Sequence, residues 1–201
     1  VLGFDTQNLT VEMVEIVQSP TDCAEKAEIV ITMLPNGKIL KSVADETIQY
    51  MKEGSIFLDC STVDVASAKS VAEIAKNHAV IPLDAPVSGG IGGAKEGTLT
   101  FMVGGPDEGF IKVNELFDIM GQKAVHCGDS GNGQSAKICN NMILGATMIA
   151  TCEAFALADK LGLDREAMFD VVSTSSGYSW SMNAYCPAPG IGPQTPSDND
   201  Y

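Results

Sequence analysis

Residues 55–84 have the sequence SIFLDCSTVDVASAKSVAEIAKNHAVIPLD, which contains one full strand–helix–strand pattern. The apolar runs 55–59 and 79–83 have the length of buried strands, while residues 64–77 between them carry apolar side chains at helical spacing. Two strands joined through a helix in this way usually run parallel and form a right-handed crossover. The stretch therefore predicts an α/β fold with a mostly parallel sheet.

The same alternation covers the chain up to about residue 127. Further strands are expected at residues 1–4, 28–33, 99–103 and 124–127. Further helices are expected at residues 19–27, 37–43, 47–51 and 106–120. Strands that alternate with helices are typical of a doubly wound sheet, which has helices on both faces.

The strand pattern stops near Ser130, where we place a domain boundary. A helix of roughly 29 residues, about 43 Å long at 1.5 Å per residue, is predicted from Asn132. Asp164 is the expected N-cap of the next helix. The expected organisation is an α/β domain at 1–129, followed by the start of an all-α domain at 130–201.

The long helix is expected to be a central packed helix, because nearly all residues from Ile138 to Leu161 are apolar or small. Its charge-free run, Met142 to Cys152, is shorter than the roughly 18 to 20 residues that a membrane span needs. We therefore interpret this run as core and predict no membrane-spanning segment.

Composition argues against several classes of protein. The chain is 45% hydrophobic, enough for a core, and its formal charge of −14 argues against nucleic acid or an anionic membrane as partner. The six cysteines show no Cys-x-x-Cys spacing and are expected to be mostly buried free thiols. His78 and His126 lie far in sequence from any cluster of Cys, Asp or Glu, so no metal is expected.

Lys137 lies one turn into the predicted long helix, in the run GQSAKICNN at 133–141. Residues at this spacing share a helix face, so Gly133 would give close access while Lys137 and Asn141 point into one space. A lysine in such an apolar setting loses hydration, which disfavours its charged form and makes it a candidate general acid or base. A lysine that extends along the helix to reach water is equally compatible with the spacing.

Ligands in open α/β sheets bind beyond the carboxyl ends of the strands. Asp5 follows the first predicted strand, where a carboxylate can bind both hydroxyls of an adenosine ribose and repel a 2′-phosphate, which favours NAD over NADP. Leu34 and Pro35 follow another strand and form a loop that can lie along a dinucleotide. Both segments are also compatible with ordinary turns.

Two more strand ends carry hydroxyl groups and glycines. Thr62 ends the segment DCST, where hydroxyls and free amides can meet a nicotinamide, a ribose or a phosphate, or can cap the following helix. Ser88, Gly89 and Gly90 end the segment DAPVSGG at 84–90, where glycines expose N–H groups and the serine adds a donor. That combination suits a small carboxylate.

The segment GNGQSA at 131–136 matches the dinucleotide fingerprint G-x-G-x-x-A, follows a strand-like run and opens a helix. In a nucleotide-binding unit the helix returns to a parallel strand, whereas this helix is predicted to run into another helix. We therefore interpret its glycines as room for substrate and cofactor beside Lys137. The true glycine-rich loop is expected before Val1.

Taken together, DAPVSGG at 84–90, the spacing G-x3-K-x3-N at 133–141 and TMLP at 32–35 closely resemble the 3-hydroxyisobutyrate dehydrogenase family of β-hydroxyacid dehydrogenases. The resemblance covers essentially the whole chain, including FMVGG at 101–105 and SSG at 175–177. It implies a partial Rossmann-type doubly wound parallel sheet that lacks its first strand and glycine-rich loop, followed by the start of an all-α domain.

By this resemblance the chain is an NAD-dependent oxidoreductase that converts 3-hydroxyisobutyrate to methylmalonate semialdehyde in valine catabolism. Lys137 would exchange a proton with the reacting hydroxyl, and Asn141 would orient Lys137 or the substrate. The implied substrate-binding residues are Ser88, Gly89, Gly90 and Asn141, and the implied cofactor-binding residues are Asp5, Leu34, Pro35 and Thr62.

The resemblance leaves a tartronate, glyoxylate or succinic semialdehyde reductase open, as well as a non-catalytic structural relative, although such relatives lack the lysine. It implies a homodimer or homotetramer at full length, in the mitochondrial matrix of a eukaryote or otherwise in the cytoplasm. We expect the chain to be cut at both ends, with a Pro/Gly-rich loop from Pro187 to its end. Without a pyrophosphate-binding loop, weak NAD binding and exposed apolar surface are expected, and activity is in doubt.

Overall fold

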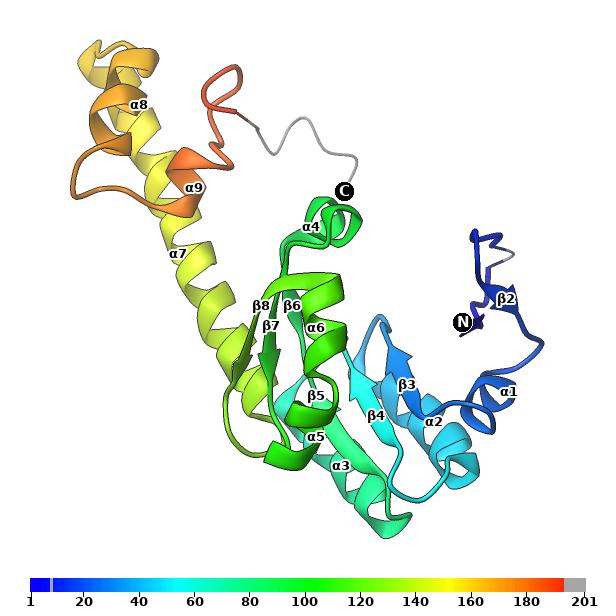
Figure 1. Cartoon of the computed structure of the whole chain (residues 1–201). Helices are drawn as coiled ribbons and strands as arrows, with labels where there is room; N and C mark the ends of the chain where they lie inside the picture. Colours follow the sequence, from blue (N-terminus) through cyan, green and yellow to red (C-terminus); the bar gives the residue numbers. More distant parts are fainter. Residues whose placement is uncertain (8, 194–201) are drawn as a thin grey trace. The chain divides into compact units, whose positions relative to one another are not determined.

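The computed structural model describes residues 1–7 and 9–193, which form two compact units (Figure 1). The units divide between Lys137 and Ile138, inside the helix α7 (Asn132–Leu161). The start of α7 therefore belongs to the first unit. The domain boundary predicted after residue 129 stays a prediction.

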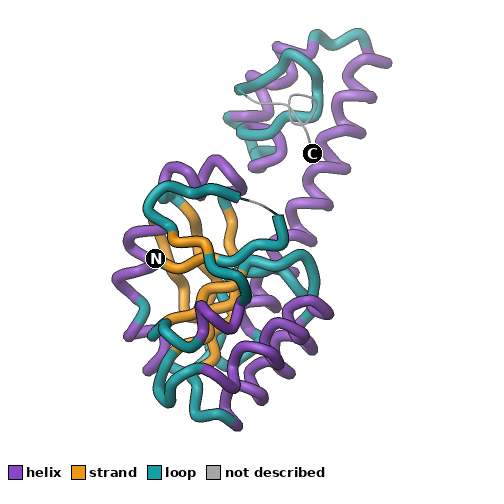
Figure 2. The backbone as a smooth tube through the Cα atoms, turned by 90° about the vertical axis from the view of Figure 1, so that its right-hand side faces the viewer, coloured by secondary structure: helices purple, strands orange, loops and turns teal. Residues whose placement is uncertain are grey.

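The strands of the first unit run mostly parallel, among helices that are drawn in purple in Figure 2. They are β1 (Leu2–Gly3), β2 (Glu15–Ile16), β3 (Ile29–Thr32), β4 (Ile56–Asp59), β5 (Ile81–Asp84), β6 (Val87–Ser88), β7 (Leu99–Val103) and β8 (Gly121–His126). β1 pairs with β2, β4 pairs with β3 and β5, and β7 pairs with β8, all in parallel. β6 pairs antiparallel with β7. The α/β class and the parallel strands are confirmed, with β6 as the exception.

Helices cover both faces of the central strands. The helices of the first unit before α7 are α1 (Pro20–Ala24), α2 (Gly37–Thr47), the 3₁₀ helix η1 (Ile48–Tyr50), α3 (Val65–Asn77), α4 (Gly90–Glu96), α5 (Asp107–Lys112) and α6 (Asn114–Met120). In β4, Phe57 packs into an apolar cluster with α2 and α3, whereas Ile56 and Leu58 pack into a cluster with α6. Two-sided burial explains why residues 56–58 of β4 are all apolar.

Some short elements were not predicted. β2 and β6 have only two residues each, too few to show an alternating pattern. α4 has the sequence GIGGAKE, and its three glycines weaken any helical signal. The single helix predicted at 106–120 is instead α5 and α6, which meet at Val113.

The second unit consists of the rest of α7, α8 (Arg165–Ser173), α9 (Trp180–Asn183) and the chain that follows. Asp164 caps α8 as predicted, since its side chain accepts a hydrogen bond from the amide of Ala167. Phe155, Ala158 and Met168 lie in its apolar cluster. The predicted Pro/Gly-rich loop has no helix or strand up to residue 193, and its remainder lies outside the described residues.

The middle of α7 is exposed, so the prediction of a packed central helix is wrong for this part of the described chain. Met142 is 68% exposed, Ile143 61% and Ile149 67%. The physical reason is that the apolar cluster of the second unit covers only the later turns of α7, from Ala154 onward. By length and composition alone α7 can also cross a membrane, contrary to the expectation from its shorter charge-free run.

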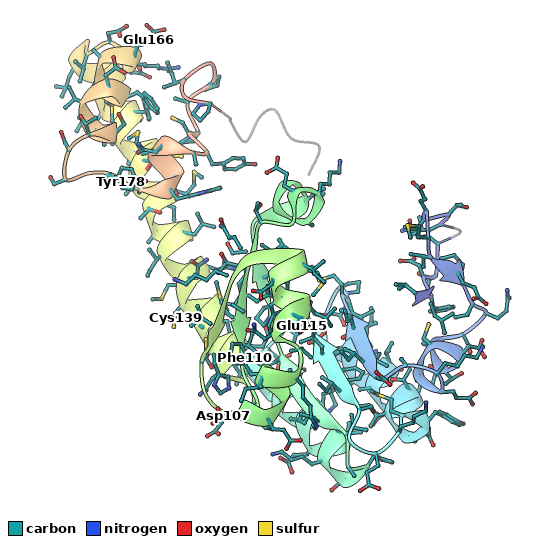
Figure 3. All side chains as sticks on the ribbon, in the orientation of Figure 1. Asp107, Phe110, Glu115, Cys139, Glu166 and Tyr178 are labelled. Carbon is teal, nitrogen blue, oxygen red and sulfur yellow. The ribbon has the colours of Figure 1, made fainter. Side chains whose placement is uncertain are left out.

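The cysteines are all free thiols, but they are not all buried. Cys60 and Cys186 are buried, whereas Cys139, which is labelled in Figure 3, and Cys152 are exposed. Both exposed thiols lie on α7. The expectation of mostly buried cysteines therefore fails at the same helix as the expectation of a packed core.

Candidate functional site

Lys137 is held close to the segment predicted to bind a carboxylate. Its Nζ donates a hydrogen bond of 2.7 Å to the carbonyl oxygen of Val87, the residue before Ser88. The lysine is partly buried, and this burial lowers the pKa of its ammonium group because the charged form loses hydration. The structure thus places a partly desolvated amine, hydrogen-bonded to backbone, beside a polar turn.

Ser88, Gly89 and Gly90 form a turn that depends on glycine. Ser88 ends β6 and is partly buried, while both glycines are exposed. Gly89 has a φ of 133° and Gly90 a φ of 61°, values that side chains rarely tolerate. The turn therefore brings an exposed backbone segment next to the carbonyl group that Lys137 contacts.

Asn141 lies on α7 four residues after Lys137, in the part of the helix that belongs to the second unit. Its Oδ1 accepts a hydrogen bond of 3.2 Å from the Asn140 side chain, and the residue is exposed. Its predicted role in orienting Lys137 or a substrate stays a prediction.

The residues predicted to bind the cofactor follow β1, β3 and β4. Asp5 is exposed, and its Oδ1 accepts a hydrogen bond of 2.7 Å from the amide of Gln7, which is the turn contact left open by the sequence. Pro35 and Thr62 are exposed after the neighbouring strands β3 and β4, whose carboxyl ends share one edge. Leu34 is tied to the β4 side, because its amide donates to Ser61 Oγ at 2.7 Å.

A row of buried polar residues crosses the carboxyl ends of β3, β4 and β5. Thr32 pairs in register with Asp59, and Asp59 pairs with Asp84. Thr32 Oγ1 donates to Asp59 Oδ1 at 2.7 Å, and Ser61 Oγ donates to the same oxygen at 2.6 Å. Burial raises the pKa of both carboxyl groups, that of Asp84 to about 6. No group of three or more His, Cys, Asp or Glu in the described ranges is arranged to hold a metal ion.

Asp84 and Gln134 attach the start of α7 to these strands. The Asp84 carboxylate accepts hydrogen bonds from the amides of Gly131, at 2.6 Å, and Gln134, at 2.9 Å. The Gln134 side chain is fully buried, donating to the Ser61 carbonyl at 2.7 Å and accepting from the Val63 amide at 3.1 Å. The two hydrogen bonds to Asp84 satisfy backbone amide groups that a helix N-terminus leaves without an internal partner.

Gly133 does not provide room for a ligand, so that interpretation is wrong. A Cβ atom at Gly133 would collide with the carbonyl oxygens of Met102 and Asp84. The missing side chain instead lets α7 approach the backbone of β5 and β7. The expectation that the helix after GNGQSA does not return to a parallel strand agrees with the fold, because α7 is followed by helices and by no strand up to residue 193.

Sequence reasoning missed Gln134, which it treated as an arbitrary position of the G-x-G-x-x-A fingerprint. The available signal was a long amide side chain at the start of an apolar helix, three residues before Lys137. A buried amide needs partners for both its N–H and its C=O groups. Such a residue marks a contact to another part of the chain.

Comparison with known proteins shows the class to which this fold belongs. Residues 4–128 match the family described as the NAD binding domain of 6-phosphogluconate dehydrogenase. Residues 131–195 match the family described as NAD-binding of NADP-dependent 3-hydroxyisobutyrate dehydrogenase. The chain therefore belongs to the 6-phosphogluconate dehydrogenase family of NAD-binding domains, which supports a nicotinamide dinucleotide, NAD or NADP, as cofactor.

Individual relatives confirm the resemblance to 3-hydroxyisobutyrate dehydrogenases. The chain is 47% identical to that enzyme of Pseudomonas aeruginosa, over 91% of the chain and 62% of the relative. It is 45% identical to the human mitochondrial 3-hydroxyisobutyrate dehydrogenase, over 93% of the chain and 56% of the relative. The structure of the Mycobacterium tuberculosis 3-hydroxyisobutyrate dehydrogenase with L-serine matches at a TM-score of 0.88 and 40% identity, over 94% of this chain and 65% of that one. The chain thus spans less than two thirds of each relative.

Proposed function

We propose that this chain is part of an NAD-dependent dehydrogenase that oxidises 3-hydroxyisobutyrate to methylmalonate semialdehyde, a step of valine catabolism. The observation that carries the proposal is the 2.7 Å contact between Lys137 Nζ and the Val87 carbonyl, next to the Ser88–Gly90 turn. This contact brings a candidate base to a candidate carboxylate-binding turn. The names of the relatives support the substrate.

In this mechanism Lys137 accepts the proton of the substrate hydroxyl. Its lowered pKa increases the fraction of neutral amine at a given pH, which an acceptor of protons requires. Ser88, Gly89 and Gly90 hold the substrate carboxylate, and Asn141 orients the substrate or Lys137. NAD, held by its predicted residues, would supply the hydride-accepting nicotinamide of this oxidation.

The residues that would hold NAD are Asp5, Leu34, Pro35 and Thr62. Their fit rests on three exposed side chains, those of Asp5, Pro35 and Thr62, at the carboxyl ends of parallel strands. The exposed carboxylate of Asp5 favours NAD over NADP because it repels a 2′-phosphate.

Replacement of Lys137 tests the proposal directly. In a chain extended to the length of its relatives, Lys137→Ala is expected to lower kcat for NADH formation from 3-hydroxyisobutyrate about 10²- to 10⁴-fold. Lys160→Ala is the matched control, since Lys160 is exposed near the end of the same helix. Equal rates for the Lys137→Ala variant and the unaltered protein would remove the lysine from the mechanism.

The substrate is tested by competition among hydroxyacids. We expect a higher kcat/KM for 3-hydroxyisobutyrate than for glycerate, glycolate or 4-hydroxybutyrate. A preference for one of these would identify a tartronate, glyoxylate or succinic semialdehyde reductase instead. We further propose a homodimer or homotetramer at full length, in the mitochondrial matrix if the organism is a eukaryote, and otherwise in the cytoplasm.

A further inference from the structure

Gln134 makes a two-point contact with the backbone on either side of Thr62. Its Nε2 donates to the carbonyl oxygen of Ser61, and its Oε1 accepts from the amide of Val63. Ser61 and Val63 are buried, whereas Thr62 between them is exposed. The side-chain amide thus binds an extended segment much as a neighbouring strand would, through one C=O and one N–H group.

The backbone of the same residue fixes the start of α7. The Gln134 amide donates to Asp84 Oδ2 at 2.9 Å, while Gly131 binds the other oxygen of that carboxylate. Lys137 lies three residues further on, which places it on a neighbouring part of the same helix face. One residue therefore determines where the Thr62 segment lies and where the turn that carries Lys137 lies.

The fit around Gln134 leaves little freedom for either segment to move alone. The side chain is 0% exposed, and both ends of its amide have partners. At Gly104, a Cβ atom would come within 2.7 Å of Asp84 Oδ1 and of the Gly133 amide. A close backbone approach and an amide with partners at both ends together hold the first turn of α7, up to Lys137, in one position on the strands of the first unit.

We propose that Gln134 is a positioning residue that couples Thr62, the candidate cofactor contact, to Lys137, the candidate proton acceptor. The roles of those two residues rest on the proposed function, but the coupling between their positions does not. Loss of the side-chain amide of Gln134 releases the Thr62 segment. It also lets the helical turn that carries Lys137 shift away from the Val87 carbonyl.

The first test compares Gln134→Met with Gln49→Met in the 201-residue chain. Gln49 is exposed in η1, and its amide donates to the nearby carbonyl groups of Asp45 and Glu46 in α2, the helix that leads directly into η1. The pKa of Lys137 is measured by NMR titration of ¹³C-methylated lysines, with its signal assigned from Lys137→Arg. Protection of the Val63 amide is measured by hydrogen exchange.

In Gln134→Met, Val63 protection is expected to fall at least about tenfold. The pKa of Lys137 is expected to rise toward its ordinary value of 10.5. Gln49→Met is expected to change neither. If Val63 loses protection while the pKa of Lys137 stays the same, or if neither changes, the coupling is absent and the proposal is overturned.

A second variant covers the case in which Gln134→Met does not fold. In Gln134→Glu, an ionised carboxylate faces the Ser61 carbonyl without a donor, whereas the protonated acid donates an O–H group to it. Repulsion between the ionised carboxylate and the Ser61 carbonyl oxygen is expected to push the segment away, so that Val63 protection relative to the unaltered chain falls at high pH and recovers on acidification. An unchanged ratio across the pH range would overturn the proposal.

Activity distinguishes this proposal from the proposed function. In the extended, active protein, Gln134→Met is expected to raise the KM for NAD and to lower kcat together. If Lys137→Ala keeps full activity while both structural readouts still move in Gln134→Met, the proposed function fails and the coupling stands. If only Lys137→Ala lowers kcat, and Gln134→Met changes neither kinetic constant nor structural readout, the coupling fails alone.

Discussion

The start of α7 and its middle belong to one helix but lie in opposite environments. Gln134 is 0% exposed and bound to Ser61 and Val63 in the segment that follows β4, whereas Met142 is 68% exposed. The polar residue is buried because its partners are present, and the apolar residue is exposed because no described side chain covers it. Polar groups with matched partners therefore fix where a helix lies, while apolar side chains indicate only that a surface can be buried.

The largest expected contrast is between apolar side chains in the two regions. Leu58→Ala, at 0% exposure in β4, is expected to lower the free energy of unfolding by about 2–5 kcal/mol, because it leaves a cavity. Ile149→Ala, at 67% exposure on α7, is expected to change it by less than about 0.5 kcal/mol. Urea unfolding followed by circular dichroism measures both. A loss at Ile149 comparable to that at Leu58 would show that this part of α7 is covered in solution.

The next contrast concerns pH and the attachment of α7. Burial raises the pKa of Asp84 to about 6, above its ordinary value of 3.8, so the fold favours the neutral acid. Its stabilising contribution is fully present below about pH 4 and is lost as pH rises through about 6, by about 2 to 3 kcal/mol. The difference in unfolding free energy between the unaltered chain and Asp84→Asn is expected to fall over that range. A difference that grows with pH would mean that the amides of Gly131 and Gln134 outweigh burial.

The smallest single effects are expected at two glycines of α7. Gly133→Ala is expected to destabilise the chain by about 1–3 kcal/mol, because the new methyl group meets the backbone of β5 and β7. Gly145→Ala has open space around its Cβ and is expected to stabilise the chain by about 0.5–1 kcal/mol through helix propensity. Thermal unfolding of the two variants measures both effects. Changes of the same sign would show that the start and the middle of α7 do not differ in packing.

Strand–helix alternation predicted the fold because each strand and each helix can be recognised from neighbouring residues in the sequence. The first three residues of β4, IFL at 56–58, are all apolar since both faces of the strand are buried, and that pattern needs no knowledge of partners. Residue pattern singled out both Lys137 and Ser88, the resemblance gave them roles, and the structure brings their segments together. Gly133 was misinterpreted because spacing along a helix does not show which side meets other backbone.

Gln134 could not be found from local pattern for a related reason. Its partners Val63 and Ser61 lie 71 and 73 residues earlier in the chain, and nothing beside Gln134 in the sequence points to them. The exposure of Met142 was also beyond prediction, since apolar composition states what a helix can bury and not what covers it.

The attachment of α7 also has a consequence for the order in which this molecule assembles. Asp84 reaches the Gly131 amide across 47 residues, and Gln134 reaches Ser61 across 73. Contacts between residues so far apart in the sequence stabilise the chain only after the loops between them have closed. The binding positions of these groups exist once β4 and β5 have paired. We therefore expect the N-terminal turn of α7 to be among the last parts of the first unit to become native.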